Sequence, residues 1–129
     1  MKNPLEKSTA KTVLVVEDEA ILLEVLSDRL KEDGWDVKKA ANGEEAIEFL
    51  FKNPVNLVLL DLLLPKKSGF EVLETIKADA ALKDIPVIVL SNLGGDEDIK
   101  KAMELGANDY FVKTQHPIGE VLEKIEKYK

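Results

Sequence analysis

An almost unbroken apolar stretch, NLVLLDLLLP at residues 56–65, constrains this chain more than any other feature. Strands this hydrophobic are typically buried on both faces, as in a parallel sheet that helices cover on both sides. A charged side chain inside such a stretch loses its hydration, so its presence needs a chemical reason. Asp61 is that side chain, and any account of the protein has to explain it.

Apolar segments and helical patterns alternate along the chain. The apolar segments are rich in β-branched residues or leucine and cover residues 12–18, 35–40, 56–61, 86–91 and 109–113. The helical patterns cover residues 20–34, 42–53, 68–78, 96–106 and 117–129. Capping residues support these boundaries: Asn42, Ser68 and Pro117 at helix starts, Gly34 and Gly106 at helix ends.

The first helical pattern contains five apolar residues that we interpret as one buried stripe. They are Ile21, Leu22, Val25, Leu26 and Leu30.

This alternation predicts an α/β fold of the flavodoxin-like type, a doubly wound five-stranded parallel sheet with helices on both faces. The segment at 35–40 alternates apolar and polar residues, which is typical of an edge strand, whereas the segments at 12–18, 56–61 and 86–91 are continuously apolar. The strand order 2-1-3-4-5, counted along the chain, satisfies this pattern. Its topological switch point, where ligands bind in such folds, lies between the first and third strands.

Size and composition exclude several classes of protein. The 129 residues, 45% of them hydrophobic, suit one domain, which we place at residues 11–129 after a flexible tail at residues 1–10. The net charge of −7 argues against direct contact with nucleic acid or an anionic membrane. The chain has no cysteine for disulfides or thiolate metal sites, and no apolar run long enough to span a bilayer. We therefore expect a cytoplasmic protein.

Polar side chains stand at the ends of four predicted strands. They are Glu17 and Asp18, Asp61, Ser91 and Lys113. The carboxyl ends of parallel strands meet at one edge of a sheet, so these groups are expected to converge. Singly, each also suits a solvated loop or a cap, but three clustered carboxylates repel one another unless a cation joins them. Oxygen ligands with positions left open for phosphate favour Mg²⁺, and an aspartate can be a covalent phosphoryl acceptor.

Four motifs, VLVVEDE, LLDLLLPKKSG, VIVLSN and DYFVK, resemble those of bacterial two-component response-regulator receiver domains of the single-domain chemotaxis type. The resemblance extends from Thr12 to Lys127. It implies that Asp61 is the phosphoacceptor, supplied by a histidine kinase or a histidine phosphotransfer protein. It also implies that Asp18 binds Mg²⁺ directly and Glu17 through water.

The same resemblance implies further roles in the site. Leu63 would give Mg²⁺ a backbone carbonyl, Ser91 would be the switch hydroxyl, and Lys113 would bind the phosphoryl group. Tyr110 would be the aromatic switch residue. The apolar side chains of Leu63 and Leu93 would flank the path of an attacking water and slow the loss of the phosphoryl group. The output surface would comprise the fourth helix, fifth strand and fifth helix, and would bind a downstream protein.

The chain departs from the common family pattern in three places. Glu17 stands where an aspartate is more frequent, and Leu64 where a methionine is. Thr114 follows Lys113 where the family has a proline, often in a cis peptide, so we expect a trans bond or a rearranged loop here. His116, the only histidine, is interpreted as a capping or surface residue without a chemical role.

Two other hypotheses fit the residues. An aspartate-nucleophile phosphatase or phosphotransferase would use the same acceptor, but such enzymes carry a second acid where this chain has Leu63. A receiver-like module locked in one state would bind partners without phosphorylation, and Thr114 keeps that hypothesis open. A chain that ends at Lys129 would act by binding other proteins, whereas an excised one could have preceded a DNA-binding or enzymatic domain.

Overall fold

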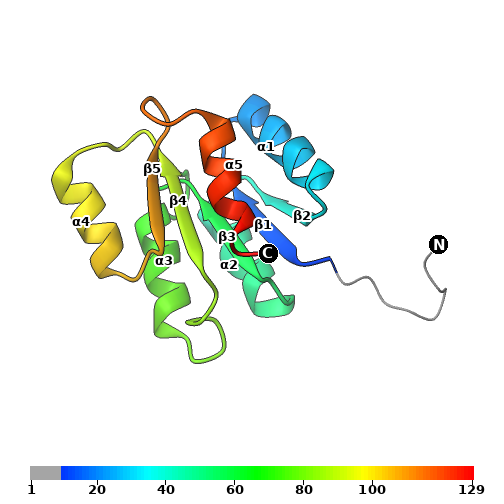
Figure 1. The fold of residues 1–129 in the computed structure, drawn as a ribbon. Coiled ribbons are helices and arrows are strands. Elements are labelled where there is room, and N and C mark those ends of the chain that lie inside the picture. Colours follow the sequence, from blue (N-terminus) through cyan, green and yellow to red (C-terminus); the bar gives the residue numbers. More distant parts are fainter. Residues whose placement is uncertain (1–9) are drawn as a thin grey trace.

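Five parallel strands form the centre of the computed structural model, which describes residues 10–129 (Figure 1). The strands are β1 (Thr12–Val16), β2 (Asp36–Ala40), β3 (Leu57–Leu60), β4 (Val87–Ser91) and β5 (Asp109–Val112). Their order is β2-β1-β3-β4-β5, which confirms the predicted flavodoxin-like sheet. Strands β1, β3 and β4 are central and almost fully buried, whereas the edge strand β2 leaves Asp36, Lys38 and Lys39 exposed. The predicted tail at residues 1–10 falls, apart from Ala10, outside the described residues.

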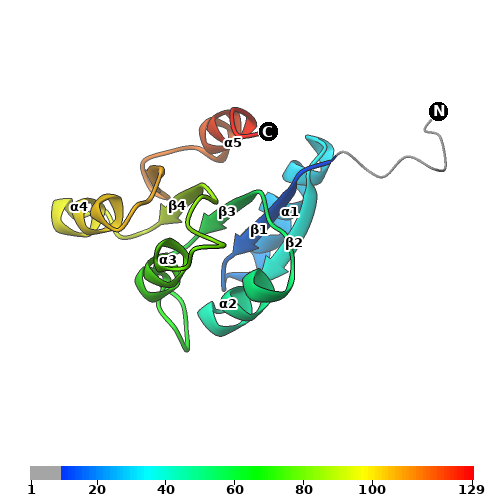
Figure 2. The same ribbon diagram turned by 90° about the horizontal axis from the view of Figure 1, so that it is seen from below.

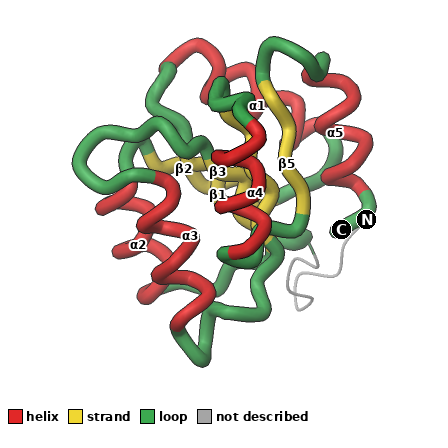
Figure 3. The backbone as a smooth tube through the Cα atoms, turned by 90° about the vertical axis from the view of Figure 1, so that its left-hand side faces the viewer, coloured by secondary structure: helices red, strands yellow, loops and turns green. Residues whose placement is uncertain are grey.

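Helices cover both faces of the sheet, as predicted (Figures 2 and 3). They are α1 (Ala20–Glu32), α2 (Gly43–Lys52), α3 (Gly69–Ala78), α4 (Asp96–Glu104) and α5 (Ile118–Glu126). On one face, α1 and α5 pack against the odd-numbered residues of β1, such as Val13 and Val15. On the other, α2, α3 and α4 pack against Leu14 and Val16. Alternate side chains of each strand therefore contribute to two separate hydrophobic cores.

The helix ends follow the capping residues of the sequence closely. The side chain of Asn42 accepts from the Glu45 N–H at 2.9 Å, and that of Ser68 starts α3 in the same way. Gly34 and Gly106 follow α1 and α4 with φ of 93° and 107°, a conformation that favours glycine. Pro117 is the residue before α5, which begins one position later than predicted.

The predicted buried stripe of α1 was wrong in part. Leu26 and Leu30 are buried, but Ile21 is 83% exposed and Val25 is 40% exposed. Ile21 and Leu30 are nine residues apart, about two and a half turns at roughly 3.6 residues per turn, so they lie on opposite sides of the helix. The exposed apolar side instead borders an open groove of about 650 Å³, lined by Glu19, Ala20, Ile21, Leu22, Val25 and Ile118.

The register of the sheet aligns the carboxyl ends of four strands. Val16 pairs with Leu60 between β1 and β3, so the next residues of both strands emerge side by side. Ser91 pairs with Val112 between β4 and β5, and the N–H of Lys113 donates to the Ser91 carbonyl at 2.9 Å. None of the helices in residues 10–129 combines the length and the apolar composition that a membrane span requires.

Candidate functional site

Asp61 follows β3 directly, and only 4% of it is exposed. Its backbone N–H donates to the Val16 carbonyl at 3.0 Å, which ties it to the end of β1. One carboxylate oxygen, Oδ1, accepts from the Leu63 N–H at 3.0 Å, and the other, Oδ2, lies 2.8 Å from Nζ of Lys113. Both oxygens therefore have partners, which is what allows a carboxylate to end a buried strand.

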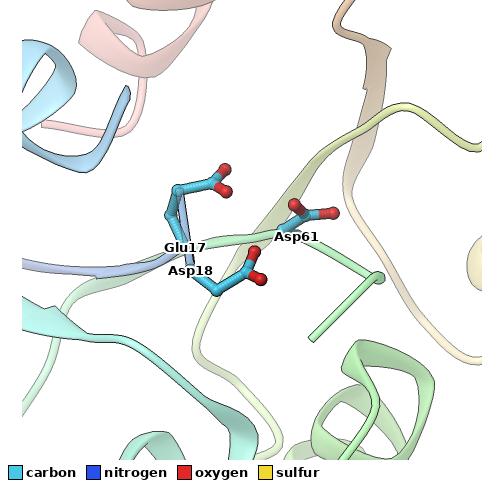
Figure 4. A group of neighbouring side chains, drawn as sticks. All are labelled: Glu17, Asp18 and Asp61. Carbon is cyan, nitrogen blue, oxygen red and sulfur yellow. The ribbon is translucent and has the colours of Figure 1, made fainter. Parts of the chain in front are cut away.

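Glu17 and Asp18 bring two more carboxylates to Asp61 (Figure 4). One oxygen from each of the three groups lies within 4.8 Å of the others. Glu17 is 2% exposed, while Asp18 faces solvent. The donors are all hard oxygens, one of them open to solvent, and this is the ligand set that Mg²⁺ prefers. The cluster resembles a magnesium site.

Lys113 lies among the carboxylates at the end of β5. Its Nζ is 2.8 Å from Asp61, 2.9 Å from Oε1 of Glu17 and 3.7 Å from Oε2 of Glu19. Burial alone lowers the pKa of Lys113, but hydrogen bonds to Asp61 and then Glu17 outweigh it and raise the pKa above its usual value. Lys113 therefore stays charged. Sequence reasoning missed Glu19, although it directly follows Asp18 in the first motif.

Ser91 and Tyr110 contact the same loop after β4. Ser91 is fully buried, and its Oγ accepts from the Leu93 N–H at 3.4 Å. The Tyr110 hydroxyl donates to the Leu93 carbonyl. Burial, with smaller contributions from the charges of Asp98 and Asp61, raises the pKa of Tyr110 to about 12, so the phenol remains a neutral donor. The loop is thus tied to β4 and to β5.

Leu63 and Gly69 follow Asp61 in the chain, and Leu93 follows Ser91. Leu63 is 49% exposed, and Leu93 is half-buried against the core beneath α3 and α4. A Cβ on Gly69 would lie 2.2 Å from the Asp61 carbonyl oxygen, so only glycine permits α3 to start this close to β3. Sequence reasoning assigned Gly69 no role, although the motif containing it was recognised.

The loop after Lys113 differs from expectation at one residue. The described residues contain no cis peptide bond, so the Lys113–Thr114 bond is trans, as expected. The interpretation of His116 as a capping or surface residue was wrong. It is half-buried, and its Nδ1 lies 3.1 Å from the Val112 N–H at the end of β5. The α5 helix has no side-chain cap at this end.

The chain matches a known family over most of its length. A family model described as the response regulator receiver domain matches residues 13–126. The chain belongs to the response regulator receiver domain family. The resemblance predicted from the four motifs is therefore confirmed, and this receiver domain is part of the two-component signalling proteins.

Three relatives illustrate the similarity. Response regulator RR06 of Streptococcus pneumoniae is 41% identical over 101 residues, covering 78% of this chain and 45% of that protein. The phosphate regulon transcriptional regulatory protein PhoB of Klebsiella pneumoniae is 36% identical, covering 84% and 47%. The structure of response regulator TrrA from Thermotoga maritima, solved with Mg²⁺–BeF, has a TM-score of 0.80 and 34% identity, covering 92% and 99%. The chain spans about half the length of the curated relatives that it matches.

Glu17 makes stability depend on pH. Burial raises its pKa from 4.5 to about 7, although the hydrogen bond from Lys113 opposes the shift. Between these values the folded protein holds a proton that the unfolded chain has lost, so this contribution is present below about pH 4.5 and is lost as the pH rises through 7. We expect the free energy of unfolding to fall by up to about 3 kcal/mol across this window.

Urea unfolding of wild type and Glu17→Gln from pH 4.5 to pH 8 measures the effect, since the amide cannot ionise. Glu74→Gln, on the exposed side of α3, is the matched control and should keep the wild-type slope. A Glu17→Gln profile parallel to wild type would show that Glu17 titrates as an ordinary glutamate.

Proposed function

We propose that this receiver domain accepts a phosphoryl group at Asp61 from a phosphohistidine of a histidine kinase or histidine phosphotransfer protein. The observation that carries the proposal is the Asp61 carboxylate at a strand end, 2.8 Å from Nζ of Lys113 and close to two further acids. A carboxylate held at a sheet edge with an adjacent fixed cation suits a nucleophile that develops into an acyl phosphate.

The proposed phosphoryl transfer is a nucleophilic displacement at phosphorus. One Asp61 oxygen bonds to phosphorus while the phosphorus–nitrogen bond of the donor breaks, and its electron pair stays on the imidazole, which takes a proton from water. Lys113, now paired with Asp61 and Glu17, would turn to the new phosphoryl oxygens, because they carry the greater charge. Ser91 would donate its hydroxyl to one of them.

Mg²⁺ belongs to this proposal. Glu17, Asp18 and Asp61 would hold it with the Leu63 carbonyl, and it would neutralise charge on the transferring phosphoryl group. Lys113 contacts Glu17, Glu19 and Asp61. Asp18 adds a fourth carboxylate, so the site carries excess negative charge. Burial, and to a smaller extent the charge of Asp61, raises the pKa of Glu17. A divalent cation would relieve both.

The two alternative hypotheses are less well supported. Aspartate-nucleophile phosphatases and phosphotransferases carry a second acid two residues after the nucleophile, and this chain has the half-exposed Leu63 at that position. A locked module would not need Lys113 poised on Asp61 with Ser91 buried beside it. We therefore favour a signalling switch over an enzyme.

Labelling with acetyl phosphate tests the proposal. We expect stoichiometric incorporation in the presence of Mg²⁺, none in Asp61→Asn, and strongly reduced incorporation in Asp18→Ala or with chelator, because the acceptor or its metal ligand is lost. Intact-protein mass spectrometry measures the product, and Glu74→Gln serves as the control. Multiple turnover without stable label would favour the enzyme, and an unlabelled wild type would favour the locked module.

The signal would leave the site through the loop after β4. We propose that phosphorylation draws Ser91 and this loop inward, and that α4, β5 and α5 then change their preference for a downstream protein. Two features support this: the Tyr110 hydroxyl already bonds the loop at Leu93, and an open groove of about 410 Å³ lies on the same surface. The groove is lined by Asp109, Tyr110, Phe111, Glu120, Glu123, Lys124 and Lys127.

Ser91→Ala should separate labelling from its readout. We expect Ser91→Ala to be labelled at Asp61 but to show smaller amide shifts at Gly94 and Gly95, because one charge-assisted hydrogen bond worth about 1.5–3 kcal/mol is lost. A full population swing needs roughly 5.5 kcal/mol, so the loss should be visible. NMR spectra before and after phosphorylation measure it. Equal shifts in both proteins would contradict the role of Ser91.

Leu63 and Leu93 are proposed to set the lifetime of the phosphoryl group. Leu63 stands beside Asp61, and Leu93 follows Ser91 by two residues and packs partly into the core. Neither side chain can hydrogen-bond an attacking water, so hydrolysis by in-line attack should be slow.

The double variant Leu63→Asn, Leu93→Glu should lose its phosphoryl group at least about tenfold faster than wild type, a change of about 1.4 kcal/mol in the barrier. Decay of the purified phosphoprotein with Mg²⁺ present measures the rate. The exposed Met103 of α4 offers a control, Met103→Gln, which should decay as wild type does. A double variant that decays at the wild-type rate would show that these leucines do not limit the access of water to the phosphoryl group.

The remaining proposals concern extent and location. We propose that residues 11–129 form the receiver domain, and that it works in the cytoplasm with protein partners. The net charge of −7 supports protein partners over nucleic acid. PhoB, named above, is a transcriptional regulatory protein, but the matched part is 47% of its length.

A further inference from the structure

His116 forms a hydrogen bond at the end of β5 that has no part in the proposed phosphoryl transfer. Strand β5 is at the edge of the sheet, and the Lys113 N–H points toward β4, where it donates to Ser91. Consecutive amides of a strand point to opposite sides, so the Val112 N–H points away from the sheet. An unpaired amide here would cost free energy, and Nδ1 of His116 accepts from it at 3.1 Å.

The tautomer of His116 follows from its neighbours. Nδ1 also lies 3.2 Å from the Val112 carbonyl, to which it could donate if it carried the proton. That carbonyl already accepts from the backbone N–H groups of Gln115 and His116, at 2.9 and 3.0 Å. The Val112 N–H points away from β4, and Nδ1 of His116 accepts from it. Placing the proton on Nε2 therefore leaves Nδ1 free to accept from the Val112 N–H.

The ring of His116 is also held in place by packing. It meets the buried ring of Phe111 edge to face, with centroids 5.2 Å apart and planes at 86°. Such an arrangement is favourable between aromatic rings. His116 therefore binds both backbone groups of Val112, the N–H through its ring and the carbonyl through its own backbone N–H.

Two parts of the site, Lys113 and the loop after β4, depend on the position of Val112. Lys113 follows it directly, and its long side chain must bring Nζ to within 3 Å of two carboxylates. A Cβ on Gly94 would lie 3.2 Å from the Val112 side chain, so the loop after β4 rests on the same residue. Thr114, unlike a proline, leaves its own φ free, so hydrogen bonds have to fix this turn.

We infer that His116 is a positioning residue: by accepting from the Val112 N–H, it holds the end of β5 so that Lys113 reaches Asp61. The inference rests on the proposed function in so far as Lys113 serves phosphorylation. The hydrogen bond itself, and its effect on Lys113, exist without phosphorylation.

Matched substitutions distinguish positioning from simple packing. In His116→Asn, Oδ1 takes the place of Nδ1 and can accept from Val112, whereas His116→Gln offers polar atoms only near the position of Nε2. His116→Ala removes both. Gln115→Ala is the control, because that change removes a neighbouring exposed side chain and keeps its backbone bond to Val112.

The experiment combines NMR with acetyl phosphate labelling. The hydrogen bond joins two nitrogens, the Val112 amide nitrogen and Nδ1 of His116. In isotope-labelled wild type we therefore expect a scalar coupling between these two nuclei. The chemical shift of the Lys113 ammonium group should differ from wild type in His116→Ala and His116→Gln. In His116→Asn it should equal the wild-type value. The initial labelling rate should fall about three- to tenfold in the first two and recover in His116→Asn, as for the loss of one hydrogen bond.

Two outcomes would overturn the inference: no coupling in wild type, or His116→Asn behaving like His116→Ala in the Lys113 signal. If wild type takes no label, the proposed function fails, but the coupling and the Lys113 signal still decide whether His116 positions the lysine.

Discussion

The ion pairs of Lys113 are the interaction on which the site depends. One ammonium group, 11% exposed, lies within 3 Å of two buried carboxylates that come from different strands. Without it, Asp61 and Glu17 would face each other in a poorly hydrated place, where like charges are costly. The lysine thus joins β1, β3 and β5 at one point, and any change of charge on Asp61 must change what Lys113 contacts.

The sheet makes this arrangement possible, because parallel strands deliver side chains from distant parts of the sequence to one edge. Lys113 is 52 residues from Asp61, yet both follow the last residue of a strand. The elements that start after the strands adapt to this crowding: Gly69 lets α3 begin against the backbone of Asp61. Burial at this edge also raises the pKa of Glu17, so the site holds a carboxyl group that is costly to ionise.

The loops around the site are held by few bonds, and each one links the site to another element. The loop after β4 depends on Ser91 and Tyr110, and the loop after β5 on His116. Helix α4 has Ala102 as its only buried residue, so its position depends on such contacts more than on core packing. In the proposed function, a charge added at Asp61 would act on the surface formed by α4, β5 and α5 through these contacts.

The sequence by itself determined the element order, the strand order and the residues at the strand ends, because burial on both faces and helix periodicity leave clear patterns in β1, β3 and β4. It also determined the family, through four motifs. Only the tertiary structure decided which side of α1 is buried, since Ile21 and Leu30 both look apolar in the chain. It alone showed Glu19 beside Lys113 and His116 beside Val112. These contacts depend on how loops fold back in three dimensions, and no local periodicity encodes that.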